Sequence, residues 1–381
     1  MDGFELALPR RVVVGPGRAA ELADLVPTLG RRVLLCTGRD PDRHRDLLGG
    51  ADPAAVVRVT REPTVDAAEQ AVARARAAGA DAVVAIGGGS VLDLGKTLAV
   101  LLGNGTEPLD HLEIVGRGVP ITRPAVPFVA VPTTAGTGAE ATANAVLRSP
   151  AHGRKASLRS PHMLAAVALV DPLLTLGCPP AVTASSGLDA LTQCLEPYVC
   201  TRANPATDAL AADGLRRAAR SLRRAYTDGD DRDARADMAV CSLFGGVALA
   251  NAGLGAVHGL AGVVGGAVEA PHGAVCAALL APVVAANVAA LRAREPDSPA
   301  LRRYAEVAAL LTGRADATVE DGVEWLRATV AALDVPPLGA VGLDPARHAE
   351  VAEKAAAASS MRANPVTLRA DELVAALAAA S

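Results

Sequence analysis

Three side chains in the second half of the chain belong to types that bind divalent metal ions, and a fourth could join them. Asp189 and Gln193 are four residues apart in a stretch of helical periodicity, so they share one face of the expected helix. His258 and His272 follow in apolar, glycine-rich sequence. From these residues alone, a metal site and a pair of core histidines bonded to backbone carbonyls are equally good interpretations. We expect the other five histidines to be exposed: His44, His111, His152, His162 and His348.

A glycine-rich loop in the first half has the composition of a phosphate-binding turn. Gly87-Gly88-Gly89-Ser90 follows an apolar run and opens a helical pattern. Glycines allow the backbone to approach a phosphate, and the free N–H groups of the helix N-terminus attract it. Ser90 is placed to cap the helix, with Asp93 completing a Ser-x-x-Asp capping box. The alternative is a tight strand-to-helix turn that holds no ligand.

A second loop, residues 131–140, also follows an apolar run. It carries hydroxyl groups that suit a pyrophosphate, a ribose or a nicotinamide amide, on Thr133, Thr134 and Thr137. If both runs are strands of one parallel sheet, their loops face the same crevice, where ligands of open α/β sheets bind. The glycine spacing is not the Rossmann G-x-G-x-x-G.

The elements that position these loops alternate between strand and helix. We expect strands at residues 11–14, 33–37, 56–59, 82–86, 128–131 and 166–170. Helical patterns separate several of them, at residues 18–26 (ended by Pro27), 65–78 and 91–102. Strands separated by such helices indicate βαβ crossovers and a parallel sheet.

After Asp171-Pro172 the chain becomes rich in Ala, Leu and Arg and has helical periodicity. Helices are expected near residues 181–195, 204–225, 234–252, 273–291, 300–312, 317–332, 345–358 and 370–380. The sequence therefore predicts two domains: an α/β domain over residues 1–176 and an all-α domain over residues 177–381. Both proline-containing stretches near residues 172 and 180 mark the boundary.

Composition argues against several classes of partner. The net charge is −4 and arginine is spread along the chain, so we expect neither a nucleic-acid surface nor a membrane patch. The N-terminus lacks the pattern of a secretory signal, and residues 274–290 are apolar but short, which favours a buried helix. The cysteines lack C-x-x-C spacing and suit buried, reduced thiols in the cytoplasm: Cys36, Cys178, Cys194, Cys200, Cys241 and Cys276.

Several of these segments resemble the iron-containing (group III) alcohol dehydrogenase family along nearly the whole chain. Residues 87–96 are similar to the family's GGGSxxDxAK signature, with Gly95 in place of alanine. Residues 132–140 are similar to its PTTAGTGSE segment, with Ala139 in place of serine. Stretches 170–172, 187–192 and 359–365 follow in the family's order. The resemblance implies a dinucleotide-binding domain and a helical domain, with the site between them, as in the dehydroquinate synthase-like architecture.

The resemblance also implies a metal site. Relatives bind metal with an aspartate, a histidine four residues later, and two histidines spaced as His258 and His272 are. Asp189 matches, but Gln193 stands where the first histidine is expected, and its oxygen is a weaker donor than imidazole. Fe²⁺ is expected, with Zn²⁺ as the other option. Gly262 also replaces a histidine found in many relatives, which leaves proton relay to water or ribose hydroxyls and enlarges the pocket.

The coenzyme preference is predicted from the end of the second strand. Many relatives place an acidic residue there, where it holds the adenosine ribose of NAD. Here Gly38 removes that carboxylate, and Arg39 could pair with a 2′-phosphate, although an ordinary turn with a solvated arginine is the alternative. We therefore expect NADPH before NADH.

The predicted reaction is hydride transfer between a nicotinamide and a small alcohol or aldehyde, with Asp189, His258 and His272 at the metal. Lys155 and Arg362 are further candidates for an anionic substrate. The main alternative is a metal-independent reductase of an anionic oxo-acid, as in the maleylacetate reductases, because Gln193 weakens the ligand set. A dehydroquinate synthase-like lyase and a non-catalytic protein with a decayed metal site fit less well. We expect a homodimer or a larger homo-oligomer by analogy with the family.

Overall fold

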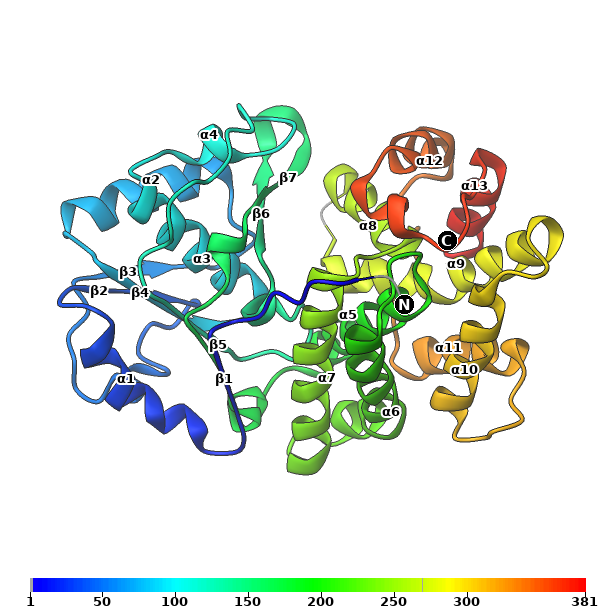
Figure 1. Cartoon of the computed structure of the whole chain (residues 1–381), viewed down its shortest axis with the longest axis horizontal. Coiled ribbons are helices and arrows are strands. Elements are labelled where there is room, and N and C mark those ends of the chain that lie inside the picture. The colour runs from blue at the N-terminus through cyan, green and yellow to red at the C-terminus, as the bar shows by residue number, and fades with distance from the viewer. Residues whose placement is uncertain (1–2, 269) are drawn as a thin grey trace. The chain divides into compact units, whose positions relative to one another are not determined.

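The apolar runs expected as strands form one parallel β-sheet in the order β1-β8-β5-β4-β2-β3 (Figure 1). This computed structural model describes residues 3–268 and 270–381. The strands are β1 (Arg11–Val14), β2 (Val33–Thr37), β3 (Ala55–Arg58), β4 (Ala82–Gly87), β5 (Phe128–Pro132) and β8 (Val167–Val170). Every neighbouring pair is parallel, so the predicted parallel sheet is confirmed.

Both faces of the sheet are buried, because alternate side chains of each strand point to opposite sides. Leu34 and Cys36 pack with helices α2 (Val65–Ala77) and α3 (Gly89–Asn104). Val33 and Leu35 pack on the other face with α1 (Leu22–Leu29) (Figure 1). Continuous apolar runs such as Val33–Thr37 therefore reflect burial on two faces.

Two features of this part of the chain differ from the sequence-based expectation. Pro27 does not end α1, which continues to Leu29, because a proline near the end of a short helix removes only one backbone hydrogen bond. An antiparallel hairpin of β6 (Asn144–Ser149) and β7 (Arg154–Arg159) was not predicted. Its turn contains Gly153 at a φ of +58°, a conformation that favours glycine.

The rest of the chain is helical, as predicted. Its helices are α5 (Pro180–Val199), α6 (Pro205–Thr227), α7 (Arg232–Asn251), α8 (Ala256–Ala267), α9 (His272–Arg294), α10 (Pro299–Thr312), α11 (Val319–Ala332), α12 (His348–Ala356) and α13 (Ala370–Ala379). The sequence did not predict α8, because its glycines lower helix propensity. Val257, Leu260 and Val264 of α8 are buried in the helical core, so packing stabilises this helix.

Contacts group the chain into two units. The sheet unit comprises Ala7–Thr134 and Gly138–Leu176. The helical unit comprises Gly177–Ser381 together with two short segments, residues 3–6 and Ala135–Thr137. Because both short segments come from the first half of the sequence, the units interleave along the chain.

Burial agrees with most expectations for the cysteines and for the apolar stretch at residues 274–290. All six cysteines lie in the described residues and none forms a disulfide; five are buried, whereas Cys178 is half-buried. Helix α9 is long and apolar enough to cross a membrane, with a mean hydropathy of 2.2, but 78% of that window is buried inside the structure. The expectation of a buried helix is therefore confirmed.

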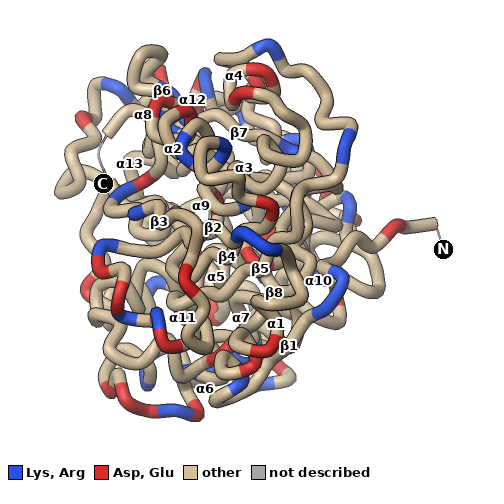
Figure 2. Tube along the Cα trace, turned by 90° about the vertical axis from the view of Figure 1, so that its left-hand side faces the viewer, with Lys and Arg blue, Asp and Glu red and all other residues tan. Residues whose placement is uncertain are grey.

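Two histidines expected at the surface are buried instead. His111 bonds through Nδ1 to the Val119 carbonyl and through Nε2 to the Thr106 hydroxyl, and the ring of His348 bonds to Ser381. Their polar sequence neighbours gave no sign of this, because the partners come from folding. Charged residues of both signs are interspersed along the described trace (Figure 2).

A buried ionisable cluster joins α3 to the segment after β5. The ammonium group of Lys96 donates to the Thr142 hydroxyl at 2.8 Å and to the Asn144 carbonyl at 2.7 Å. Burial lowers the pKa of Lys96 to about 8, and raises the pKa of Asp93 to about 6 and of Glu140 to about 7. These three groups therefore titrate close to neutral pH.

We predict that the free energy of unfolding of the wild type falls as the pH rises from about 5 to about 7, and that it falls less in Glu140→Gln. The pKa of Glu140 is raised from 4.5 to about 7, so the folded state holds this proton more tightly than the unfolded state. That contribution is complete below the unfolded pKa and is lost as the pH rises through the folded pKa. Melting temperatures across this range test it, with Glu353→Gln at an exposed position as control. Identical pH profiles for wild type and Glu140→Gln would contradict the assignment.

Candidate functional site

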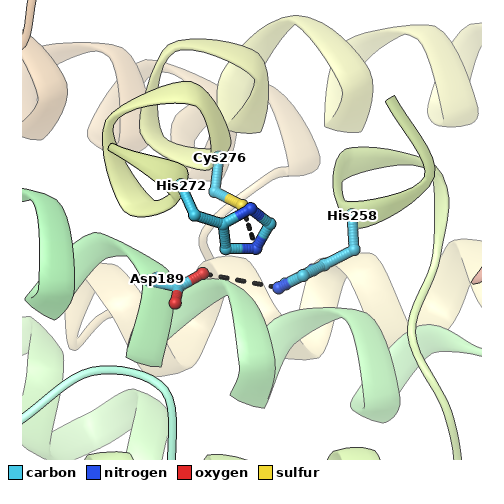
Figure 3. A group of neighbouring side chains, drawn as sticks. All are labelled: Asp189, His258, His272 and Cys276. Carbon is cyan, nitrogen blue, oxygen red and sulfur yellow. Dashed lines mark hydrogen bonds and ion pairs between the residues drawn. The ribbon is translucent and has the colours of Figure 1, made fainter. Parts of the chain in front are cut away.

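Three helices bring Asp189, His258 and His272 together in the helical unit (Figure 3). Asp189 lies on α5, His258 on α8, and His272 is the first residue of α9. Cys276 joins them from one turn along α9, and one donor atom from each of the four residues lies within 4.8 Å of the others. Three of the four metal-ligating residues predicted from the sequence therefore meet a cysteine that was not predicted, and the fourth, Gln193, contacts Asp189.

The close approach of α9 to α5 depends on a glycine. A Cβ atom at Gly273 would lie 2.4 Å from the Ser185 carbonyl oxygen and 3.4 Å from Asp189 Cβ. A side chain there would push the first turn of α9 away from α5. Gly273 thus allows His272 to lie beside Asp189.

A second buried carboxylate orients His258. Glu196, also on α5, accepts a hydrogen bond from His258 Nδ1 at 2.6 Å and another from the Val257 backbone N–H at 2.7 Å. With Nδ1 donating, Nε2 is the ring nitrogen left free, and it lies 3.4 Å from Asp189 Oδ1. A carboxylate behind a histidine is the usual outer partner of a metal-binding imidazole.

Gln193 also contacts Asp189. Its Nε2 donates to Asp189 Oδ2 at 3.0 Å, while its Oε1 is buried without a hydrogen-bond partner. Two further buried atoms of the group lack a hydrogen-bond partner, namely Asp189 Oδ1 and His258 Nε2. Leaving buried acceptors and donors unbonded is costly, and a bound cation would satisfy the lone pairs of all three.

The charge of the group also suits a cation. Burial opposes ionisation of Asp189, but the neighbouring imidazoles of His258 and His272 outweigh it and lower its pKa. Asp189 and Glu196 are both nearly inaccessible to solvent, at 2% and 4% exposure. Oxygen, nitrogen and sulfur donors in one buried group match the ligands of iron and zinc.

Glu196 and Cys276 were not predicted as site residues, although helical spacing points to both. Glu196 lies seven residues after Asp189 and Cys276 lies four after His272, so each shares a helix face with a predicted ligand. Glu196 was overlooked because its partner, His258, is distant in the sequence. Cys276 was counted only as a buried thiol.

The segment at residues 359–365 has a structural role at the N-terminus of α8. Asn364 accepts from the Ala256 N–H at 3.0 Å and donates to the Asn287 side chain and the Val366 carbonyl. A Cβ at Gly255 would lie 2.8 Å from Asn364 Oδ1 and 2.9 Å from Glu196 Oε1. Two remote side chains therefore cap α8, the helix that carries His258. Arg362 of the same segment is exposed.

In the sheet unit, the first glycine loop connects β4 directly to α3. Gly88 is the N-cap and no side chain caps the helix, which leaves its N-terminal amides to a ligand. The predicted capping box is wrong, because α3 begins at Gly89 and Ser90 is already in its first turn. Asp93 instead accepts from the Val146 N–H at 3.2 Å.

The second loop leaves the neighbouring strand at the same edge of the sheet. Gly87 pairs with Pro132, and the Thr133 N–H donates to the Gly87 carbonyl at 3.0 Å. Thr134 lies against Gly88, where a Cβ would be 3.3 Å from its hydroxyl oxygen. The first loop and this pair of threonines are therefore adjacent, as the sequence predicted. Thr137 belongs to the short segment grouped with the helical unit.

The remaining candidates also lie in the sheet unit. Gly38 and Arg39 follow β2, which pairs in parallel with β4. Thr37 at the end of β2 lies opposite Ile86, so both loops leave the same edge of the sheet. Arg39 is exposed, and nothing would obstruct a Cβ at Gly38 within 4 Å. Lys155 forms an ion pair with Glu62, and its catalytic role stays a prediction.

Comparison with known proteins places these features in a family. The family description "Iron-containing alcohol dehydrogenase" matches residues 9–172, and "Fe-containing alcohol dehydrogenase family, C-terminal" matches residues 183–381. The two matches together take in the glycine loop and all four residues around the candidate metal centre.

Relatives with this type of name are similar to the chain in sequence. The chain is 42% identical to long-chain-alcohol dehydrogenase 1 of Geobacillus thermodenitrificans (strain NG80-2) over 58% of its own length, but covers only 55% of that relative. It is 35% identical to the probable alcohol dehydrogenase EutG of Escherichia coli (strain K12), covering 84% of this chain and 78% of the relative.

Solved structures match over the whole chain. A 1,3-propanediol oxidoreductase has a TM-score of 0.89 at 30% identity and 100% coverage of both chains. A maleylacetate reductase from Rhizobium sp. strain MTP-10005 has a TM-score of 0.79 at 27% identity, covering 100% of this chain and 98% of that one. Because family descriptions match both halves of its sequence, this chain belongs to the iron-containing alcohol dehydrogenase family.

Proposed function

We propose that this protein is a metal-dependent oxidoreductase that transfers a hydride between NAD(P)H and a small alcohol or aldehyde. The observation that carries the proposal is the buried group of Asp189, His258 and His272, in which Asp189 Oδ1 and His258 Nε2 have no hydrogen-bond partner. Membership of the family supports the reaction class.

Asp189, His258 and His272 would hold the metal, Fe²⁺ or Zn²⁺. Such an ion, when bound, supplies a Lewis acid that polarises the oxygen of the substrate. Glu196 holds the His258 ring with Nε2 free, and Gln193 donates to Asp189 Oδ2. The fourth ligand predicted from the sequence is Gln193, whose Oε1 is buried without a hydrogen-bond partner.

The cofactor is proposed to bind at the carboxyl edge of the sheet. The uncapped N-terminus of α3 suits its phosphates, and the hydroxyls of Thr133 and Thr134 lie beside that turn. The residues proposed to bind it are Gly38, Arg39, Gly87, Gly88, Gly89, Ser90, Asp93, Thr133, Thr134 and Thr137. The nicotinamide supplies or accepts the hydride.

Gly262, one turn after His258 on α8, has open space where a side chain would begin, since a Cβ would meet nothing within 4 Å. This supports the larger pocket expected from the sequence. It also supports proton relay by water or ribose hydroxyls in place of a protein imidazole.

A metal-independent reductase of an anionic oxo-acid is the second candidate. The observation in its favour is Gln193, where the family places a histidine. The buried donor atoms without partners favour the metal-dependent reaction over it.

The protein is proposed to act in the cytoplasm as a homo-oligomer. Six cysteines in the described residues, none of them in a disulfide, support a reducing compartment, the cytoplasm. Exposed apolar side chains recur near the N-terminus, at Phe4, Leu6 and Leu8, which supports assembly into a homodimer or a larger homo-oligomer. The expected partners are otherwise small molecules.

We predict that chelation removes activity and that added Fe²⁺ or Zn²⁺ restores it. Metal content and the NADPH- and NADH-linked reduction of short aldehydes are measured before and after chelation. His258→Ala and His272→Ala should each lower kcat/KM by more than the roughly 10- to 100-fold that loss of an outer-shell partner costs. His162→Ala, outside the metal group, is the control.

Unchanged turnover in both His258→Ala and His272→Ala would show that the proposed metal chemistry is wrong. Metal-free protein that still reduces an anionic oxo-acid would move the assignment to the second candidate.

Glu196→Gln should weaken metal binding by roughly 10- to 100-fold while the protein stays folded. The amide has one acceptor atom, whereas Glu196 accepts from both His258 Nδ1 and the Val257 N–H. Competition with a chromophoric chelator measures the affinity. Glu306→Gln is the matched control, because Glu306 accepts from the Tyr198 hydroxyl instead. Equal affinity in the two variants would remove Glu196 from the metal centre.

Arg39→Ala should raise the KM for NADPH by about tenfold, equivalent to about 1.4 kcal/mol, and leave the KM for NADH unchanged. The reason is loss of a charge-assisted hydrogen bond to the 2′-phosphate. Steady-state kinetics with both coenzymes measure it. An equal change for both coenzymes would indicate that Arg39 does not read the 2′-phosphate.

A further inference from the structure

Cys276 lies inside the candidate metal centre, although neither the family resemblance nor the sequence motif assigned it a role. It is fully buried, one turn after His272 on α9, and its Sγ lies 3.5 Å from His272 Nε2 (Figure 3). Burial raises the pKa of this thiol to about 12. The other donor atoms around this thiol distinguish a metal ligand from a thiol that is merely packed beside an imidazole.

The spacing of the donor atoms fits four ligands of one ion. Bonds of about 2.0–2.1 Å to oxygen and nitrogen and about 2.3 Å to sulfur separate tetrahedral ligand atoms by about 3.3–3.5 Å. Two distances between donor atoms fall in this range: His258 Nε2 lies 3.4 Å from Asp189 Oδ1, and Cys276 Sγ lies 3.5 Å from His272 Nε2. Two separations therefore have the length expected between ligands of one ion, and all donor atoms of the group lie within 4.8 Å of one another.

Two unpartnered atoms show that the group is built for a ligand. Asp189 Oδ1 and His258 Nε2 are buried without hydrogen bonds, and both residues belong with Cys276 to the group whose donor atoms lie within 4.8 Å of one another. The two atoms lie 3.4 Å apart, beyond the normal length of an N–H···O hydrogen bond, and a cation between them would bond to both.

Gln193 competes with Cys276 for the fourth position, and its contacts favour a different role. The Gln193 amide nitrogen is directed at Asp189 Oδ2, at 3.0 Å. This bond holds the carboxylate so that Oδ1 faces His258. Gln193 is then a positioning residue, and the histidine that the family places there is replaced by a donor from another helix.

We propose that Cys276 supplies the fourth protein ligand, giving an Asp189, His258, His272 and Cys276 site that selects Zn²⁺ over Fe²⁺. The inference rests on the proposed metal-dependent function. On binding, the Cys276 S–H bond breaks, a metal–sulfur bond forms and the proton passes to solvent, with no change of oxidation state. A thiolate among nitrogen and oxygen ligands is a softer donor set than the histidine-rich site of the family, and it favours zinc. Zinc also accepts a fifth ligand, which leaves a position for the substrate.

The test is cobalt substitution of the full-length protein. The metal-depleted chain is loaded with Co²⁺, and its near-ultraviolet absorption is recorded for a thiolate-to-cobalt charge-transfer band. X-ray absorption of the zinc form should show one sulfur neighbour at about 2.3 Å. Wild type and Gln193→Ala should give both signals, and Cys276→Ala and Cys276→Ser should lose them, with zinc affinity lowered at least about tenfold.

Cys241→Ala is the matched control, because Cys241 is also a buried cysteine of the helical unit but faces Cys194, with the two sulfurs 3.9 Å apart. It should keep both signals. Stoichiometric metal without a sulfur signal in the wild type would overturn the role of Cys276 and leave the metal-dependent function standing. A wild type that binds neither Co²⁺ nor Zn²⁺ would overturn both.

Discussion

The carboxylate of Glu196 on α5 holds both the start of α8 and the ring of His258, on which the candidate metal site depends. One oxygen accepts from the Val257 backbone N–H, which fixes the N-terminus of α8 against α5. The other accepts from His258 Nδ1, which sets the tautomer and leaves Nε2 facing Asp189. A buried carboxylate is costly unless its lone pairs are bonded, so this arrangement persists only while α8 holds its position. The orientation of His258 is therefore a consequence of helix packing.

Small residues make that packing close enough. Gly273 allows α9 to begin against the backbone of α5, and Gly255 leaves room for Glu196 and Asn364 at the start of α8. In the sheet unit Gly95 has the same function, since a Cβ there would lie 2.7 Å from Ala85 Cβ and 3.1 Å from the Phe128 ring. This contact with Phe128 explains why glycine stands where the family usually has alanine. In each case the missing Cβ brings two elements together, and functional side chains lie at or beside the contact.

The two units use buried polar groups in different ways. In the sheet unit, Lys96 is satisfied by the Thr142 hydroxyl and the Asn144 carbonyl, with two carboxyls nearby. In the helical unit, Asp189 Oδ1, Gln193 Oε1 and His258 Nε2 have no hydrogen-bond partner. The first arrangement is complete with protein groups, whereas the second needs a cation to satisfy it.

The sequence by itself determined the parts of this protein that depend on local pattern. Apolar runs such as Val33–Thr37 predicted the parallel sheet, and the glycines after β4 predicted its turn into α3, because strand burial and glycine turns have short-range signatures. Asp189, His258 and His272 were found from residue type and the family resemblance. Helix starts were less certain, since Ser90 has the composition of a cap but α3 begins one residue before it.

Only the tertiary structure decided which groups meet. Helix α8 is poor in helix propensity and forms because its apolar face is buried, and the hairpin β6–β7 depends on pairing across its turn. His111 and His348 are buried because their partners come from other segments. Glu196 contacts His258 on α8, and Cys276 lies in one group with Asp189 on α5, so each meets a residue of another helix. The contacts of Glu196 and Cys276 with other helices depend on packing over long sequence separations, which no local pattern encodes.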